Sequence, residues 1–183
     1  RRALTDEELK HVIYGIDHHP YGLLVGILLA CGLRPGEARA LTWDNVDIKQ
    51  KTISIVQAVE SGTNNRLKEP KSAAGKRSIP IPDWYRERLA RSPVRSLHGY
   101  VFPNPQGGII TEHHFRRIWH SFFRMIDIHA GAKLYRNEII EHALSQDITP
   151  YYLRHTYATN LAEAGVDMKT AQYLLGHSDI GLT

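Results

Sequence analysis

The sequence lacks the patterns of residues that build disulfide frameworks, membrane segments or metal sites. Its single cysteine, Cys31, excludes a disulfide framework and is typical of a reducing compartment. The longest apolar stretch, residues 21–33, is shorter than the roughly 20 residues that a membrane helix needs, and no signal-peptide pattern opens the chain. The histidine pairs at 18–19 and 113–114 cannot share a helix face, and no Cys/His ligand set or metal-nuclease carboxylate cluster accompanies them. We therefore expect a cytoplasmic protein with no membrane segment, no metal and no other cofactor.

Positive charge exceeds negative charge. The 183 residues carry 23 Lys and Arg against 19 Asp and Glu, which gives a formal net charge of +4 at pH 7, and 11 histidines add to it at lower pH. The length suits one domain with its own core, and the basic balance favours a polyanionic partner such as nucleic acid.

The first part of the chain predicts helices around a junction. Thr5 and Glu8 have the spacing of a capping box, which predicts a helix beginning at residue 6. Residues 21–31 read as a mostly apolar helix closed by a glycine, and Pro35 suits the first turn of a short helix. Arg34 therefore lies at a helix junction.

Two short segments predict a sheet. Residues 52–56 and 77–81 alternate apolar and polar side chains, and a polar segment rich in Asn, Lys and Gly separates them. We expect a small antiparallel sheet near residues 46–82 with an exposed basic turn.

The second part of the chain is mainly helical. Residues 84–90 read as a helix and 100–103 as an extended piece, whereas 128–147 are polar and give no assignable pattern. Thr111 can cap a helix over 112–127, whose core face is formed by Phe115, Ile118, Trp119, Phe122, Phe123 and Ile126.

Two more helices end the chain. The first begins at Pro150, with Thr149 as its N-cap, and ends at Gly165. The second is capped by Asp167 and stops at Gly176. The whole pattern predicts a mainly α fold with a small antiparallel β-sheet (α+β).

The helix that starts at Pro150 carries the strongest chemical signal. Arg154 and His155 lie three and four residues after Tyr151, so all three can face one side of the helix. A partly buried arginine offers a fork of donors that matches two phosphate oxygens, and His177 just past the next helix adds a further donor. Taken alone, Arg154 also suits a solvent-facing arginine and His155 a core histidine.

Two runs together resemble the tyrosine recombinase (phage integrase) family. Residues 153–159, Leu-Arg-His-Thr-Tyr-Ala-Thr, match its Leu-Arg-His-Thr box, and residues 31–43, which begin Cys-Gly-Leu-Arg-Pro-Gly-Glu, match its first arginine box. The resemblance extends from Thr5 to Leu182 and implies the fold of the family's catalytic domain. It implies that Arg34 and Arg154 clamp the scissile phosphate, with Glu37 as the usual acidic neighbour. Arg34 also suits a junction arginine that pairs with Glu37.

The same resemblance implies two further catalytic residues. Lys71 occupies the place of the catalytic lysine on a strand-connecting turn, where an ammonium can protonate the leaving 5′ oxygen. Lys68 and Lys76 are rivals for that role, and a solvated turn is the alternative for all three. His177 matches the second histidine, which would hydrogen-bond a phosphate oxygen; it also suits a cap at a helix C-terminus.

The chain departs from the family pattern at two places. Tyr151 stands where a histidine is common; it can donate a hydrogen bond, but a phenol with an ordinary pKa of about 10 is a poor base near neutrality. The nucleophilic tyrosine is expected near position 186 on a further helix, beyond Thr183, and Tyr173 lies on the wrong side of His177. We therefore expect residues 1–183 to be an integrase catalytic domain cut before the nucleophile helix, inactive alone and without N-terminal arm-type and core-binding domains.

The function that the resemblance implies is site-specific DNA recombination. Such an integrase cleaves and rejoins strands through a 3′-phosphotyrosyl intermediate, for integration or excision of a phage or mobile element, and needs no cofactor. Its implied partners are double-stranded DNA, three more copies of itself in a homotetramer on paired sites, and accessory DNA-bending or excision factors.

A non-catalytic DNA-binding module is the alternative. Helices over 150–164 and 168–175 imitate a helix-turn-helix. This interpretation explains the charge but not Arg34, and its second helix offers mainly Lys169 and Gln172 to DNA. A topoisomerase of related chemistry is a third interpretation.

Overall fold

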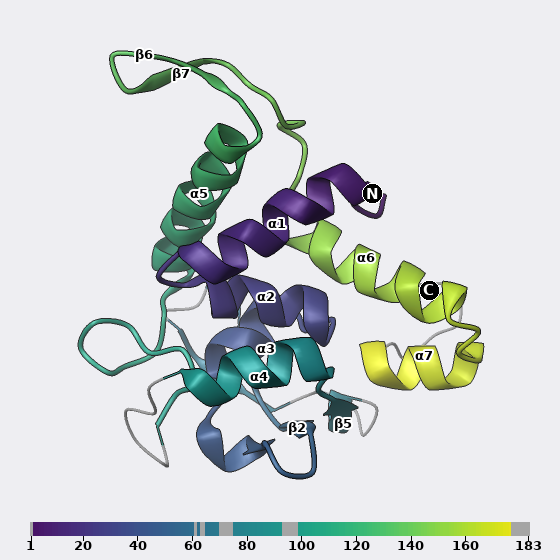
Figure 1. Ribbon diagram of the computed structural model, residues 1–183. Coiled ribbons are helices and arrows are strands. Elements are labelled where there is room, and N and C mark those ends of the chain that lie inside the picture. Colours follow the sequence, from purple (N-terminus) through teal and green to yellow (C-terminus); the bar gives the residue numbers. More distant parts are fainter. Residues whose placement is uncertain (1, 61, 63–64, 70–74, 93–98, 177–183) are drawn as a thin grey trace.

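The computed structural model describes residues 2–60, 62, 65–69, 75–92 and 99–176 (Figure 1). Its helices and short strands come in groups along the chain, in the following order: α1 Asp6–His18, α2 Gly22–Ala30, α3 Pro35–Ala40, the 3-10 turn η1 Trp43–Asn45, β1 Val46–Asp47, β2 Thr52–Ile55, β3 Ala58–Val59, β4 Leu67–Lys68, β5 Arg77–Pro80, α4 Asp83–Arg91, α5 Glu112–His129, β6 Lys133–Tyr135, β7 Glu138–Glu141, α6 Pro150–Glu163 and α7 Met168–Leu175. All strand pairs in these ranges are antiparallel, which confirms the predicted fold class.

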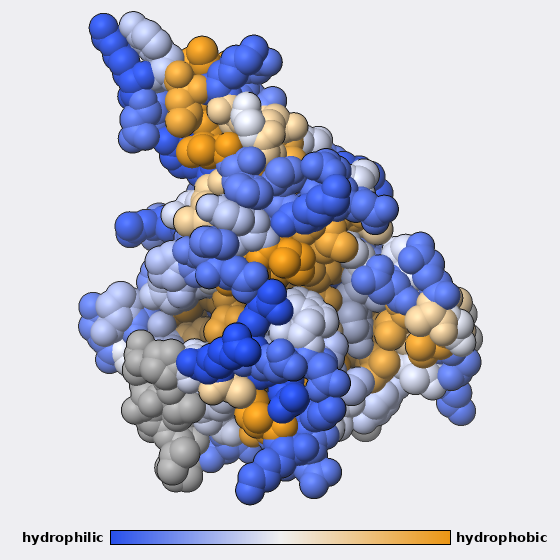
Figure 2. Space-filling view, viewed as in Figure 1, coloured by the Kyte–Doolittle hydropathy of each residue, from blue (hydrophilic) through white to orange (hydrophobic). Residues whose placement is uncertain are grey.

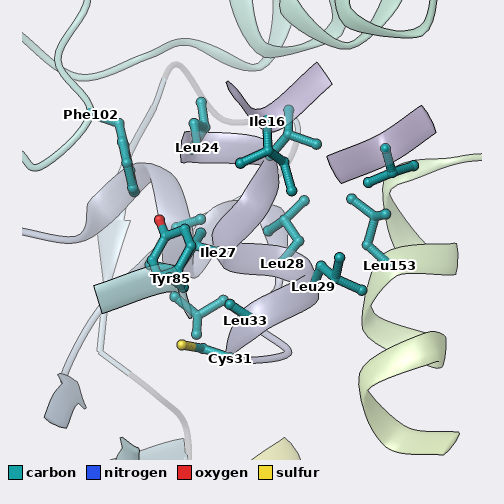
Figure 3. Close-up of a cluster of buried hydrophobic side chains, with 14 of the residues drawn as sticks. Ile16, Leu24, Ile27, Leu28, Leu29, Cys31, Leu33, Tyr85, Phe102 and Leu153 are labelled. Atoms are coloured by element: carbon teal, nitrogen blue, oxygen red, sulfur yellow. The ribbon is translucent and has the colours of Figure 1, made fainter. Parts of the chain in front are cut away.

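Helix α2 forms the centre of the core. Its sequence, GLLVGILLA, is apolar on every side, and a helix without a polar face is stable only when protein surrounds it. Leu28 is fully buried, and Ile16 of α1, Tyr85 of α4 and Leu153 of α6 lie around the same helix (Figure 3). Since α6 packs along α2, Arg154 is brought close to the residues that follow the C-terminal end of α2.

The predicted antiparallel sheet is present and contains a third strand. Its order is β1-β2-β5, and the register pairs Ile53 with Ile79 and Ile55 with Arg77. The segment between β2 and β5, expected as a basic turn, also contains the two-stranded ladder β3–β4. Strands of two residues are too short to show an alternating pattern, so no periodic signal predicts them.

Residues 128–147, which the sequence left unassigned, contain a hairpin that projects beyond α5 (Figure 1). This hairpin, β6–β7, exposes Leu134 and Ile140 among charged neighbours (Figure 2). Buried Asp127 holds its base, because its carboxylate accepts hydrogen bonds from the backbone N–H groups of Ala143 and Leu144 at 2.9 Å. Neither strand has a buried face, so no apolar alternation predicts them.

The ends of the last two helices follow the sequence with one exception. The Asp167 carboxylate accepts a hydrogen bond from the Thr170 N–H, and Gly176 closes α7 in the left-handed conformation, as expected. Thr149 takes the N-cap position of α6, but its side chain makes no capping hydrogen bond, and its buried hydroxyl has no partner among the described residues. The capping role predicted for Thr149 is therefore wrong, although the helix begins at Pro150 as expected. None of the helices in the described ranges combines the length and hydrophobicity that crossing a bilayer requires.

Candidate functional site

Three arginines from three elements meet at the C-terminal end of α7. Arg77 Nε donates to the Leu174 carbonyl at 2.8 Å, Arg154 Nη2 donates to the Leu175 carbonyl, and Arg34 Nη2 donates to the Gly176 carbonyl at 3.1 Å. The last carbonyls of a helix have no partner within it and carry the negative end of its dipole. These guanidiniums therefore hold the corner of the chain that leads to residue 177.

Arg34 occupies the N-cap position of α3 and is the most exposed of the three arginines. Its backbone N–H donates to Glu37 Oε2 at 2.8 Å, and its Nη1 donates to Glu37 Oε1 at 3.1 Å. The side chain is 39% exposed. Among the described residues, Glu37 and Gly176 are the hydrogen-bond acceptors of its side chain, so other N–H groups of the fork face solvent. The junction arginine does pair with Glu37, and it keeps donors for a ligand.

Arg154 is buried in α6, so the alternative interpretation of it as a solvent-facing arginine is wrong. Its Nη1 donates to the Gly32 carbonyl, which comes from the turn between α2 and α3. Burial, and then the positive charge of Arg34, lower the pKa of Arg154 to about 10. The group stays protonated at neutral pH. His155, one residue on, is exposed, so its interpretation as a core histidine is also wrong.

Arg77 and Glu37 form a buried pair beneath Arg34. Two parallel hydrogen bonds of 3.0 Å join Arg77 Nη1 and Nη2 to the two oxygens of Glu37, and the Arg77 side chain is 0% exposed. Burial on its own would raise the pKa of Glu37, but the hydrogen bonds and charge of Arg77, with those of Arg34, outweigh it and hold that pKa below its ordinary value.

Arg77 is a further residue of the site that the family motifs do not identify, although the strand pattern contains a signal for it. Residues 77–80 alternate buried and exposed, so Arg77 lies on the same face as Ile79. An arginine at an inward position of a strand must find a partner, because an unpaired buried charge is very unfavourable. That partner is Glu37.

The predicted site residues fall into two groups. Arg34 and Arg154 are brought together at consecutive carbonyls, and Tyr151 lies one turn before Arg154 with its side chain exposed. Lys71 and His177 lie outside the described residues. The two rival lysines form surface ion pairs, Lys68 with Glu60 at 2.9 Å and Lys76 with Glu69 at 2.7 Å.

Tyr157 is a second residue of this region that the sequence did not single out. Its ring lies against Gly32, which has a φ of 63° and would place an added Cβ 2.2 Å from Tyr157 Cδ1. Burial raises the pKa of Tyr157 to about 12, so its phenol is a poor nucleophile at neutral pH. Its role is to pack the turn that presents the Gly32 carbonyl to Arg154.

The geometry suits binding of an oxyanion. Three guanidiniums meet beside one carboxylate, and the most exposed of them retains donors that face solvent. Guanidinium groups bind phosphate oxygens in pairs and stabilise negative charge that increases during a reaction. Within the part of the chain that the structure describes, no group of three His, Cys, Asp or Glu side chains is placed to hold a metal ion.

Glu37→Gln tests the buried pair through its pH dependence. A carboxyl whose pKa is lowered in the folded state stabilises the fold above its unfolded pKa, and this contribution is lost as pH falls through the folded value. We expect Glu37→Gln to be less stable at pH 7 by about 3 kcal/mol, because Arg77 loses its charged partner. Between about pH 5 and pH 3, the variant should then lose less free energy of unfolding than the unmodified chain.

Urea unfolding at several pH values measures both effects. Glu163→Gln, which removes an exposed carboxylate at the end of α6, is the control for net charge. Identical slopes of stability against pH for Glu37→Gln and the unmodified chain would contradict the assignment of a charged Glu37.

Comparison with known proteins places the chain in a family. A family model described as the phage integrase family matches residues 3–183. A tyrosine recombinase XerC-like protein of Caldanaerobacter subterraneus subsp. tengcongensis is 28% identical over 202 residues, covering 99% of this chain and 48% of that protein. Tyrosine recombinase XerD of Pseudomonas aeruginosa is 31% identical over 177 residues, covering 90% of this chain and 49% of that protein. The chain thus spans about half the length of these curated relatives.

Solved structures share the fold. The Tn1549 transposon integrase in complex with circular intermediate DNA superposes with a TM-score of 0.76 at 23% identity, covering 98% of this chain and 60% of that one. The catalytic domain of bacteriophage HP1 integrase gives a TM-score of 0.58 at 22% identity, covering 99% and 83%. Because the family model spans residues 3–183, the resemblance to the family is confirmed, and the chain belongs to the phage integrase family.

Proposed function

We propose that this chain is the catalytic domain of a site-specific DNA recombinase. In the reaction, a tyrosine hydroxyl oxygen attacks a backbone phosphorus, the bond from phosphorus to the 5′ oxygen breaks, and a 3′-phosphotyrosyl link and a free 5′ hydroxyl result. The 5′ hydroxyl of a partner strand then reverses the step. The link conserves the phosphodiester energy, so the reaction needs no nucleotide cofactor.

The observation that carries the proposal is the meeting of Arg34 and Arg154 at consecutive carbonyls of one helix end. A phosphate placed there would meet two guanidiniums whose positions the fold fixes in advance, which is how proteins stabilise the extra charge of a phosphoryl-transfer transition state. In this proposal Lys71 protonates the leaving 5′ oxygen, His177 hydrogen-bonds a phosphate oxygen, and Tyr151 donates a hydrogen bond at the rim. The nucleophile is the tyrosine expected near position 186.

Relatives support DNA as the partner. The Tn1549 integrase and the XerH recombinase were solved bound to DNA, the latter to its difH substrate. For the whole protein we propose cytoplasmic action as a homotetramer on paired sites of a phage or mobile element, with accessory DNA-bending or excision factors. The helix-turn-helix alternative is not favoured, because the end of its second helix is turned onto Arg34, Arg77 and Arg154.

Covalent capture from a random library tests this function, because it does not require the target sequence to be known. The full-length protein is mixed with a library of randomised duplexes that carry a nick, so that cleavage releases a short strand and traps the protein on DNA. We expect an adduct that survives denaturing gel electrophoresis, and sequencing of the trapped DNA should return a recurrent site. DNA that is retained on native gels but never trapped would overturn the recombinase and favour the binding module.

A salt titration tests the phosphate-clamping surface. We expect residues 1–183 to bind a duplex weakly and with little sequence preference, with an affinity that falls as salt rises because phosphate contacts release counterions. Arg34→Met should reduce the slope of log affinity against log salt by about one, because it removes one phosphate contact. Fluorescence anisotropy at several salt concentrations measures the slope, and an affinity that is insensitive to salt would contradict the clamp.

A further inference from the structure

We propose that Arg77 is a positioning residue of the strand-transfer site: it fixes the Glu37 carboxylate and the end of α7, and through them it sets the guanidinium of Arg34. The inference rests on the proposed function for its effect on cleavage. Its structural part rests on the contacts of Arg77 alone.

The contacts of Arg77 join three elements that each lead to a predicted site residue. From β5, which follows the segment containing Lys71, its Nη groups reach Glu37 in α3, the helix that Arg34 starts. Its Nε reaches the Leu174 carbonyl at the end of α7, which leads to His177. Only a guanidinium can donate in parallel to a carboxylate and sideways to a carbonyl from one rigid plane. A lysine in its place has the charge but not this geometry.

The sharing of Glu37 gives Arg77 a second effect. Glu37 Oε1 accepts from both Arg34 Nη1 and Arg77 Nη1, and Oε2 accepts from the Arg34 backbone N–H and Arg77 Nη2. With Arg77 present, its charge balances the carboxylate, so the charge of Arg34 is left for a phosphate. Without it, Arg34 and Glu37 would neutralise one another, and the remaining charge of the site would fall.

Burial separates Arg77 from the residues that touch DNA. Its side chain is 0% exposed, whereas that of Arg34 is 39% exposed. The Gly176 corner also closes over it, because a Cβ added at Gly176 would lie 2.7 Å from Arg77 Nη1. Arg77 therefore acts on a bound phosphate through Glu37 and Arg34, and a replacement that keeps the net charge of the site should leave duplex affinity nearly unchanged.

Arg77→Lys in the full-length protein tests the proposal. The substrate is a nicked duplex that carries the recurrent site recovered by covalent capture. On it, we expect the single-turnover rate of adduct formation to fall about 10- to 100-fold, because a small displacement of a positioned group has an effect of that size. Duplex affinity should stay within about twofold, because phosphate contacts set it. Arg88→Lys is the matched control, since Arg88 also holds a carboxylate, that of Asp17, with two bonds, and should change neither quantity.

A spectroscopic measurement makes the test independent of activity. In ¹H–¹⁵N spectra, Arg77→Lys should shift and broaden the Nε–Hε signal of Arg34, whereas Arg88→Lys should leave it unchanged. An unchanged Arg34 signal overturns the inference even if recombination is established. A shifted signal in a protein that traps no DNA overturns the proposed function and leaves the link from Arg77 to Arg34 standing.

A double variant covers the case in which Arg77→Lys does not fold. Arg77→Met with Glu37→Gln removes both charges together, which buried pairs tolerate better than the loss of one partner. We expect this variant to bind duplex normally and to form adduct at least about tenfold more slowly, because Arg34 loses its support. Adduct formation at the unmodified rate, or a rate that merely follows the folded fraction, would show that Arg77 contributes stability alone.

Discussion

Replacing Arg154 by alanine in the full-length protein is expected to abolish the covalent adduct with DNA. A preorganised positive charge at a phosphoryl-transfer site contributes on the order of 3 kcal/mol or more to transition-state stabilisation, so the rate should fall by at least about 100-fold. The variant also leaves two carbonyls, those of Gly32 and Leu175, without their donor. Arg154→Lys should recover little, because an ammonium cannot reach both carbonyls and a phosphate from one plane.

The measurement is single-turnover trapping of end-labelled duplex, followed by denaturing electrophoresis. Arg88→Ala, on α4, controls for loss of an arginine elsewhere. Tyr151→Phe should be milder than either Arg154 variant, because the phenol supplies at most one hydrogen bond. Equal amounts of adduct with and without Arg154, at equal folded fractions, would show that Arg154 takes no part in the reaction and would contradict the proposed mechanism.

The fold was predictable from the sequence where burial leaves a periodic pattern. Local sequence patterns predicted three of the helices: α1 from the capping box of Thr5 and Glu8, α2 from its wholly apolar sequence, and α5 from its single apolar face. The structure contains all three. The hairpin β6–β7 was not predictable, because it has no buried face, and the buried carboxylate of Asp127 that holds its base comes from the preceding helix.

The meeting of Arg34 and Arg154 was predictable from the sequence, whereas the residues that support them were not. Arg34 and Arg154 lie in local motifs that the family resemblance identifies. The roles of Arg77 and Tyr157 were not visible there, although Tyr157 lies within the run 153–159, because those roles come from packing between segments far apart in the sequence. The inward position of Arg77 in its strand was visible, but its partner Glu37, 40 residues away, was not.

Gly32→Ala is expected to destabilise the fold strongly. The left-handed φ of 63° disfavours any residue with a Cβ by about 1 kcal/mol. The new methyl would also lie 2.2 Å from Tyr157 Cδ1, and relieving such an overlap inside a packed core costs about 1 to 3 kcal/mol more. Urea unfolding should therefore show a loss of about 2 to 4 kcal/mol.

Two companion variants separate the causes of that loss. Gly165→Ala has a similar φ of 73° but no atom within 4 Å of its added Cβ, so it should lose only the backbone contribution of about 1 kcal/mol. Tyr157→Leu combined with Gly32→Ala should be less destabilised than the sum of the single variants, because the residues are in contact. Since the Gly32 carbonyl accepts from Arg154 Nη1, the Gly32→Ala protein that remains folded should also form adduct more slowly than Gly165→Ala. Equal losses of unfolding free energy for the two glycine variants would mean that the Tyr157 ring moves aside at no cost. This turn would then not set the position of Arg154.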